Sequence, residues 1–406
     1  MHDYAWIKDK VKADFLERIS TEGELTDEEA LEEVREIISE TNLTASLSID
    51  DRIRLEREIF SSIRKLDILQ GLLDDPDVTE IMINGVDPIY VEKEGKLIKR
   101  EERFEREKLE DVIQQIVAGC NRTVNEASPI VDARLDDGSR VNVVLSPIAL
   151  NGPILTIRRF PRSPMKMDDL IRFGSITPEL VEFLRKLVKA KYNIFISGGT
   201  GSGKTTFLNV LSEFIPCEER VITIEDSAEL QIAGIDNLVR LETRNSNVEG
   251  CSPISIRDLI KSALRMRPDR VIVGEVRGAE ALDMLQAMNT GHDGSLSTGH
   301  ANSASDMLSR LETMVLMGMD LPLTAIKKQI ASGIDILIHL GRLRDRSRKL
   351  LQINEIEGFV DGEIITRVLY EFEEEYEDEA GKIHGKFIKK SNLSHTEKLK
   401  AAGVGL

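Results

Sequence analysis

Hydrophobic residues recur at helical intervals in the first part of the chain, residues 1–66. Thr26 and Glu29 have the spacing of a capping box, which predicts where one of these helices begins. The apolar residues that would share one face of that helix are Ala30, Leu31, Val34, Ile37 and Ile38. We therefore expect a small helical bundle with solvated polar faces, and a helix dedicated to a partner is the alternative.

In residues 67–160 short β-rich runs replace the helical pattern. The run IMINGVDPIYVEKEGKLIKR contains Asn-Gly and Glu-Gly turns, and ARLDDGSRVNVVLSP contains an Asp-Gly turn, so both are typical of hairpins. Between them, REKLEDVIQQIVAGC has the spacing of a helix. This segment therefore predicts one small α/β domain.

Prolines at 161 and 164 then disfavour regular structure, so residues 161–176 are interpreted as a linker. Buried-type strands alternate with amphipathic helices over residues 177–370, the pattern of a parallel sheet. The expected strands are NIFISG, RVITIED, NLVRLET, RVIVGEV and SLSTGHA. Seven of the nine residues from 371 to 379 are acidic, so we expect residues 371–406 to form a solvated, partly disordered tail.

The first of these strands runs into a glycine-rich stretch, SGGTGSGKTT, that opens a helix. It matches the phosphate-loop pattern G-x-x-x-x-G-K-[ST] at every fixed position. Backbone N–H groups of such a loop surround phosphates, Lys204 is expected to reach the β- and γ-phosphates, and Thr205 to ligate Mg²⁺. The predicted ATP-binding residues are Gly198, Gly199, Thr200, Gly201, Ser202, Gly203, Lys204, Thr205 and Thr206.

Acidic residues at the ends of two expected strands are candidates for catalysis and metal binding. Glu275 follows the buried run RVIV after one glycine, which suits a base that orients the attacking water. Glu225 ends the strand after the phosphate loop, and Asp226 and Glu229 follow it. We expect Thr205, Glu225 and Glu275 to hold Mg²⁺, in part through its water shell. If Glu275 is not the base, Glu225 or Glu229 is the alternative.

Two histidines, His292 and His300, lie in the glycine-bounded run TGHDGSLSTGHANS. As neutral donors they are expected to sense the γ-phosphate or to link the site to a moving neighbour. Their spacing does not suit zinc bound from adjacent turns, and no cysteine lies nearby.

The charge and composition of the chain bear on its partners and its location. Lysine and arginine total 54 against 71 aspartate and glutamate, a net charge of −17, and aromatic residues make up 4%. Proteins that act on nucleic acid use basic surfaces and aromatic stacking, so we expect no nucleic-acid partner. Three widely spaced cysteines suit a reducing compartment, and no apolar run is long enough to span a membrane. We expect a cytoplasmic protein whose membrane contact is peripheral.

The ordered motifs GGTGSGKTT, EDSAEL, VIVGEVRG and TGHDGSLSTGHANS resemble the Walker A, Asp-box, Walker B and His-box series of the type II/type IV secretion ATPases. The upstream runs LLDDPDVTEIMINGVDPIYVEKEGKL and LTIRRF are similar to the CpaF branch of that family, which powers Flp-type (tight-adherence) pilus assembly. The resemblance covers residues 66–360. Many relatives have leucine before the second histidine, where this chain has Gly299.

The resemblance implies an α/β fold in which a RecA-like P-loop domain follows a small N-domain and the helical segment. It also implies a homohexamer that hydrolyses ATP with Mg²⁺, turns its domains against one another and acts on an inner-membrane platform protein. Arginines that reach across subunit boundaries are part of this expectation, and Arg265, Arg267 and Arg277 rank below the main candidates. The candidates are Arg134, Arg140, Arg158 and Arg159.

Two other classes share these motifs. A RecA-like nucleic-acid translocase would have the same core, and DNA-stimulated hydrolysis would favour it. A scaffold that binds ATP without turnover would also have it, although an intact Glu275 argues against that class.

Overall fold

The computed structural model describes residues 4–22, 27–40, 47–64, 66–93, 96–120, 122–135, 137–159, 164–244 and 252–405. The chain divides between residues 162 and 163 into two compact units. Three features of the sequence analysis, the cap at Thr26, the Glu-Gly turn at 94–95 and the proline at 161, lie outside the described residues. Within them, no helix has the length and apolar character needed to cross a membrane.

The first unit begins with helices α1 (Tyr4–Glu22), α2 (Asp27–Glu40) and α3 (Ile49–Arg64), which pack on one another. Their buried apolar faces form a core of their own, because hydrophobic residues recur at helical spacing on each of them. In α2 the buried residues include Ala30, Val34, Ile37 and Ile38.

The first unit continues with α4 (Ile68–Asp74) and a six-stranded antiparallel sheet in the order β3-β2-β1-β6-β5-β4. Its strands are β1 (Val78–Asn84), β2 (Ile89–Lys93), β3 (Lys96–Lys99), β4 (Ile130–Arg134), β5 (Arg140–Val144) and β6 (Ile154–Arg158). Helix α5 (Arg106–Gly119) contributes its apolar face to the core on one side of this sheet. Alternate residues of the strands point to the opposite side.

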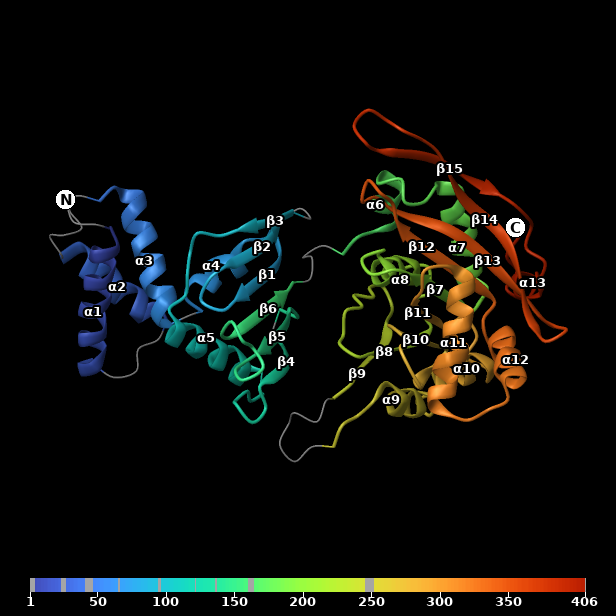
Figure 1. Cartoon of the computed structure of the whole chain (residues 1–406), viewed down its shortest axis with the longest axis horizontal. Coiled ribbons are helices and arrows are strands. Elements are labelled where there is room, and N and C mark those ends of the chain that lie inside the picture. The colour runs from blue at the N-terminus through green and yellow to red at the C-terminus, as the bar shows by residue number, and fades with distance from the viewer. Residues whose placement is uncertain are drawn as a thin grey trace. The chain divides into compact units, whose positions relative to one another are not determined.

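The second unit contains a nine-stranded sheet in the order β15-β14-β13-β12-β7-β11-β10-β8-β9 (Figure 1). Strands β12 through β9 in this order pair in parallel, and β13, β14 and β15 extend the sheet with antiparallel pairs. The parallel strands are β7 (Ile194–Gly198), β8 (Arg220–Glu225), β9 (Asn237–Glu242), β10 (Arg270–Val273), β11 (Leu296–His300) and β12 (Ile336–Arg342). The antiparallel extension consists of β13 (Arg348–Val360), β14 (Glu363–Glu377) and β15 (Ile383–Lys389).

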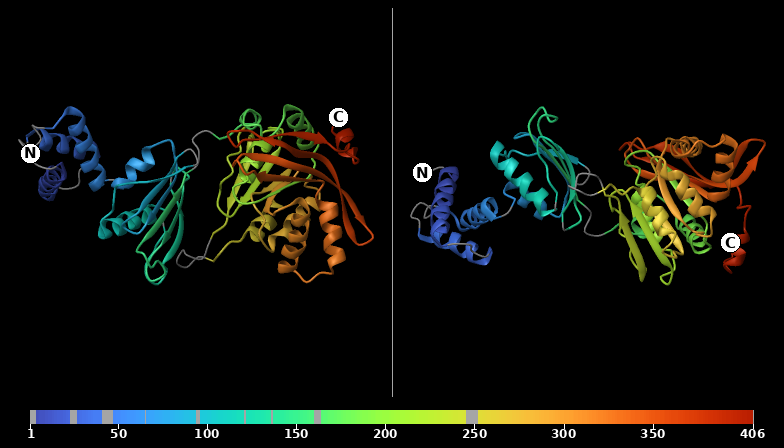
Figure 2. Two further views of the ribbon diagram at one scale, coloured as in Figure 1. Left: turned by 45° about the horizontal axis from the view of Figure 1, so that its top comes forward. Right: turned by 90° about the horizontal axis from the view of Figure 1, so that it is seen from below.

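Helices cover both faces of this sheet (Figures 1 and 2). One core lies with α6 (Met167–Arg172), α7 (Pro178–Lys189) and α8 (Lys204–Ser212). The other lies with α9 (Ile256–Ala263), α10 (Glu280–Asn289), α11 (Ala304–Gly318) and α12 (Leu323–Gly333). Along β7, Ile194 and Ile196 enter the first core and Phe195 the second, which explains why the first three residues of this strand are all apolar.

The structure differs from the expected linker over residues 161–176. Its second half forms α6, and Met167, Leu170 and Ile176 are buried in the core of the second unit. The two prolines precede this helix, so they do not argue against regular structure beyond them.

The prediction of a solvated, partly disordered tail over residues 371–406 is also wrong for most of its length. Strand β14 continues through Glu377, β15 returns antiparallel to it, and a short helix, α13 (Glu397–Ala401), follows. The acidic residues are tolerated because they pair with cations of the hairpin: Glu375 with Lys386, and Glu371 and Glu373 with Lys390. Cross-strand pairs of opposite charge stabilise a β-ladder, whereas the run read alone predicts repulsion.

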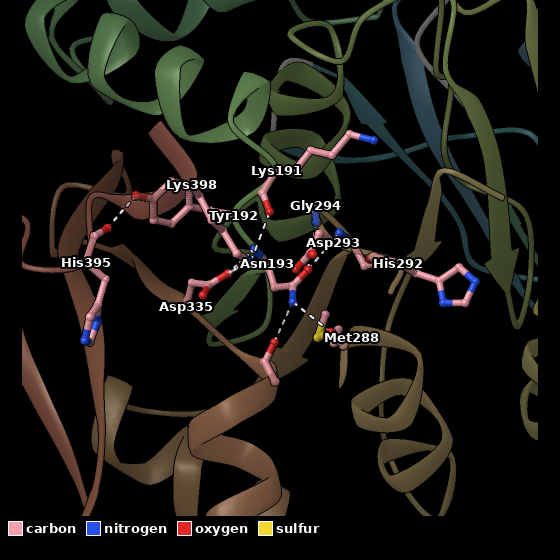
Figure 3. A network of polar contacts seen from close by, with 12 residues as sticks. Lys191, Tyr192, Asn193, Met288, His292, Asp293, Gly294, Asp335, His395 and Lys398 are labelled. Atoms are coloured by element: carbon pink, nitrogen blue, oxygen red, sulfur yellow. Dashed lines mark hydrogen bonds and ion pairs between the residues drawn. The ribbon is translucent and has the colours of Figure 1, made fainter. Parts of the chain in front are cut away.

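Residues 391–399, here called the C-terminal clamp, bind the amino edge of the parallel strands (Figure 3). The Tyr192 hydroxyl, just before β7, donates to the His395 carbonyl at 2.6 Å. Lys398 Nζ lies 2.7 Å from Asp335 Oδ2, just before β12. The end of the described chain is therefore part of the folded second unit.

Candidate active site

The phosphate loop connects β7 to α8 at the carboxyl edge of the parallel strands. Gly201 and Gly203 have φ angles of +70° and +92°, which L side chains rarely adopt. A Cβ on Gly198 would lie 2.5 Å from the Leu340 carbonyl oxygen and 2.6 Å from Ser202 Oγ. The glycines at these positions are therefore required by the loop itself, and the loop presents its backbone to a ligand.

Lys204 is the first residue of α8 and its side chain is buried. The ammonium donates to the carbonyl oxygens of Gly198 and Gly199, each at 3.1 Å. Burial lowers the pKa of Lys204, and the charge of Glu275 opposes that shift. The cation is therefore held at the loop, where a polyphosphate would satisfy it better than neutral carbonyl groups do.

His300, the last residue of β11, lies between Lys204 and Glu275. Its Nδ1 is 3.2 Å from Lys204 Nζ, and its Nε2 is 2.8 Å from Glu275 Oε1. An ammonium can only donate, so its contact with Nδ1 fits an imidazole that carries no proton on that nitrogen. Glu275 Oε1 lies beside Nε2 but has no hydrogen-bond partner within the described residues. Burial and the Lys204 charge lower the pKa of His300, which favours the neutral form.

Glu275 follows β10 and is held from its other side by Arg277. Arg277 Nε and Nη2 lie 2.8 Å and 2.6 Å from Glu275 Oε2. Arg277 ranks low among the arginines expected from the sequence, although its position two residues after Glu275 indicates this contact. In this structure a histidine and an arginine contact the carboxylate that is the candidate base.

The acidic residues at the end of β8 and just after it have different roles. Glu225 is buried, and its Oε2 accepts the backbone N–H groups of Glu229 at 2.6 Å and Leu230 at 2.8 Å. Burial raises its pKa, and these two N–H groups oppose the shift. Asp226 is exposed and bonds Thr243. Glu229 thus contributes its backbone to the position of Glu225.

The site fits a hydrated divalent cation bound with a polyphosphate. Glu225 Oε1 is buried and has no hydrogen-bond partner within the described part of the chain, so a polar ligand would satisfy it. No three histidine, cysteine, aspartate or glutamate side chains converge on a metal position in that part. A Mg²⁺ ion would therefore need phosphate oxygens and water besides the predicted ligands Thr205, Glu225 and Glu275, as Mg²⁺ sites usually do.

His292 lies away from this site within the chain, so its expected role in linking the site to a moving neighbour stays a prediction. It precedes β11, whereas His300 ends that strand, and four residue steps of strand alone span about 13 Å. His292 Nδ1 lies 3.3 Å from the Ala287 carbonyl oxygen, and its ring points away from the Asn193 network at the amino edge (Figure 3). The two Gly-His pairs look alike in the sequence, but β11 separates His292 from His300 in the structure.

The candidate arginines of the first unit form a row on its sheet. Arg134, Arg140 and Arg158 are direct partners across β4, β5 and β6, and Glu80 on β1 is the next partner of Arg158. They lie on the face opposite the apolar residues that pack with α5, because apolar neighbours alternate with them. Arg159 instead donates to the Val78 carbonyl oxygen at 3.0 Å, a contact that fixes the strand end.

Two pockets adjoin the phosphate loop. One, of about 900 Å³, lies at Thr200 and His300 and includes Arg277, Asp306 and Arg310. The other, of about 490 Å³, is here called the basic pocket and opens at Ser202, Gly203 and Thr206. Its remaining lining residues are Met165, Leu170, Arg172, Phe173, Ser175, Phe207, Leu340, Arg346, Ser347, Arg348, Lys349, Leu350 and Lys382.

Comparisons with known proteins agree with this geometry. A family model described as type II/IV secretion system protein matches residues 64–378. Conjugal transfer protein TrbB of Rhizobium radiobacter is 31% identical over 79% of this chain and 96% of its own length. Type IV secretion system protein PtlH of Bordetella pertussis is 32% identical over 68% of this chain and 89% of its own. An uncharacterised protein of Methanocaldococcus jannaschii is 40% identical over 65% of this chain, but the match spans only 38% of that relative.

Solved structures confirm the predicted fold class. The Legionella pneumophila ATPase DotB superposes with a TM-score of 0.52 at 24% identity, over 72% of this chain and 80% of its own. The pilus retraction motor PilT with bound ADP gives 0.51 at 19% identity, over 75% and 81%. The second unit therefore has the RecA-like P-loop fold of these two proteins, and a smaller α/β unit precedes it.

Proposed function

Because the chain belongs to the type II/IV secretion system protein family, we propose that it is a Mg²⁺-dependent ATPase that drives a secretion or pilus machine at a membrane. The observation that carries this proposal is the chain of contacts from Lys204 through His300 to Glu275 beside the phosphate loop. It joins a phosphate-binding cation to a carboxylate that can accept a proton from water.

In the proposed reaction, the phosphate loop and Lys204 bind the triphosphate, and Lys204 exchanges its carbonyl contacts for phosphate oxygens. Mg²⁺, when bound, would neutralise charge on the phosphates. Glu275 orients the attacking water and accepts its proton, and its Oε1 has no hydrogen-bond partner within the described residues. His300 keeps its Nε2 proton and is placed to report the state of the γ-phosphate to β11.

Purified protein is expected to release phosphate from ATP only when Mg²⁺ is present. Lys204→Ala should abolish nucleotide binding and with it hydrolysis, because the loop then lacks the side chain that pairs with the β- and γ-phosphates. Isothermal titration with ADP and a phosphate-release assay measure the two quantities. Tight ADP binding without any turnover would instead favour a nucleotide-dependent scaffold, and turnover that requires DNA would favour a nucleic-acid translocase.

We further propose that the working form is a homohexamer in which the first unit's arginine row serves a nucleotide site. This role is supported by three arginines in register on one sheet face, which concentrates positive charge that would favour phosphate. Membrane contact would be peripheral, through an inner-membrane platform protein. The resemblance of the upstream residues to the CpaF branch supports Flp-type pilus assembly as the system.

If Arg140 acts on a neighbour's nucleotide, its effect must be transferable between subunits. Mixing Arg140→Ala protein with Lys204→Ala protein is expected to restore part of the turnover that each lacks, because some interfaces then contain both intact groups. Specific activity should also fall on dilution. Activity that stays independent of concentration, with no gain on mixing, would show that each chain hydrolyses ATP alone.

A further inference from the structure

The hairpin of β14 and β15 extends to the basic pocket beside the phosphate loop. The family model matches residues 64–378, so the turn after Asp378 and β15 lie beyond it. Lys382, at the end of this turn, lines the pocket together with Ser202, Gly203 and Thr206 of the phosphate loop. A segment outside the matched region thus contributes a side chain next to the candidate nucleotide site.

Hydrogen bonds of Asp378 hold the hairpin turn together. The Asp378 backbone N–H donates to the Lys382 carbonyl at 2.9 Å, and Asp378 Oδ1 accepts the N–H groups of Ala380 at 3.0 Å and Lys382 at 2.9 Å. His384 Nε2 lies 2.8 Å from Asp378 Oδ2. These contacts fix the backbone that carries Lys382.

The turn between β12 and β13 connects the hairpin to the phosphate loop. Asp345 Oδ2 accepts the backbone N–H of Ile383 at 2.9 Å, and its Oδ1 accepts the N–H and hydroxyl of Ser347 at 2.9 Å and 2.6 Å. Arg348, the first residue of β13 directly after this turn, donates from its Nε to the Gly201 carbonyl oxygen at 2.9 Å. Two hydrogen-bonded steps therefore link the residue after Lys382 to the phosphate loop.

The lysines of the hairpin differ in their surroundings: two pair with glutamates, and one lines the basic pocket. Lys386 and Lys390 pair with glutamates of β14, so their charges are largely offset within the hairpin. Lys382 faces the basic pocket, to which Lys349 and Arg348 also contribute. Cationic side chains line this pocket beside Thr206, at the start of α8. They favour binding of the anionic phosphates of a nucleotide, next to its base and ribose.

We propose that Lys382 is a nucleotide-binding residue, which the β14–β15 hairpin brings to the phosphate loop of the same chain. The inference rests on the proposed ATPase function and adds that the ligand's α-phosphate end is held by a segment beyond the matched family region. Lys382 contributes binding of nucleoside di- and triphosphates and takes no part in water activation, which occurs at Glu275. Its removal therefore affects affinity and leaves the maximal rate in place.

The test compares Lys382→Ala with Lys386→Ala, which removes a lysine from the same hairpin but outside the pocket. Titration of the full chain with ADP and Mg²⁺ is expected to give a Kd about 3- to 10-fold higher for Lys382→Ala and unchanged for Lys386→Ala. Lys382→Arg should bind as the unaltered chain does. The difference should shrink at high salt, because an exposed charge is screened. At saturating ATP the turnover of Lys382→Ala should equal that of the unaltered chain.

The outcomes separate this inference from the function on which it rests. If the unaltered chain does not bind ADP, the proposed function fails first. If the unaltered chain binds and Lys382→Ala binds equally well, the inference is overturned. Equal weakening by Lys382→Ala and Lys386→Ala would also overturn it, because the hairpin would then act through its total charge. Should Lys382→Ala fold poorly by circular dichroism, Lys382→Gln replaces it, since it keeps a long polar side chain.

Discussion

Glu275→Gln is expected to bind ATP but to hydrolyse it about 10²–10⁴-fold more slowly than the unaltered chain. The amide keeps the size of the carboxylate but cannot accept a proton from water, and the phosphate loop that binds the nucleotide is unaltered. This amide would also present an N–H group to His300 or Arg277, each of which is a donor, so the present contacts could not all form. Phosphate release at saturating ATP measures the loss, and titration with ADP measures retained binding.

Glu229→Gln and Asp226→Asn are the matched controls for this variant. Both remove a negative charge from the same edge of the sheet, and Asp226 Oδ2 lies 3.7 Å from Arg277 Nη1. They are expected to retain most of the turnover, because the contact with His300 is made by Glu275. Turnover of Glu275→Gln within a few-fold of the unaltered chain would move the base to Glu225 or Glu229.

Glu219→Ala is expected to lower the free energy of unfolding by about 3–5 kcal/mol, because it leaves a buried guanidinium without its counter-ion. Arg270 on β10 is fully buried, and its Nε and Nη2 lie 2.6 Å and 3.0 Å from the two oxygens of Glu219. Its Nη1 donates to the Gly294 carbonyl oxygen at 3.2 Å. Urea unfolding followed by circular dichroism measures the change.

The control is Glu182→Ala, which breaks the exposed pair of Glu182 with Arg185 at 3.2 Å and is expected to cost less than about 1 kcal/mol. Replacing both buried partners, with Glu219→Leu and Arg270→Met, should recover much of the stability lost by Glu219→Ala. A loss of under about 1 kcal/mol for Glu219→Ala would contradict the assignment of Arg270 as a buried, paired charge.

Local patterns in the sequence predicted the parts of the fold that depend on neighbouring residues. The run REKLEDVIQQIVAGC forms α5 (Arg106–Gly119), as its helical spacing predicts. The five expected strands correspond to β7, β8, β9, β10 and β11. The β14–β15 hairpin was missed because its glutamates are balanced by lysines on the facing strand, and strand pairing is not visible in one run of residues.

In the candidate site, too, features carried by one short segment were predicted, and contacts between distant segments were not. Lys204 and the glycines of the phosphate loop were readable because one short segment carries all of them. Glu275 was readable from its position at the end of a buried run, and its contact with His300 confirms that these two motifs meet. Arg348 approaches Gly201 from a strand 147 positions later in the chain, and nothing in its own neighbourhood predicts that contact.

The C-terminal clamp has a consequence for the order in which the protein can be completed during synthesis. Tyr192 leaves the ribosome long before its partner, since 203 positions separate it from His395. The amino edge of the sheet must therefore wait, with Asp335 and its neighbours open to water, until residues 391–399 have been translated. Because so distant a pair forms slowly, nascent chains halted before residue 391 should expose this edge to chaperones and to one another.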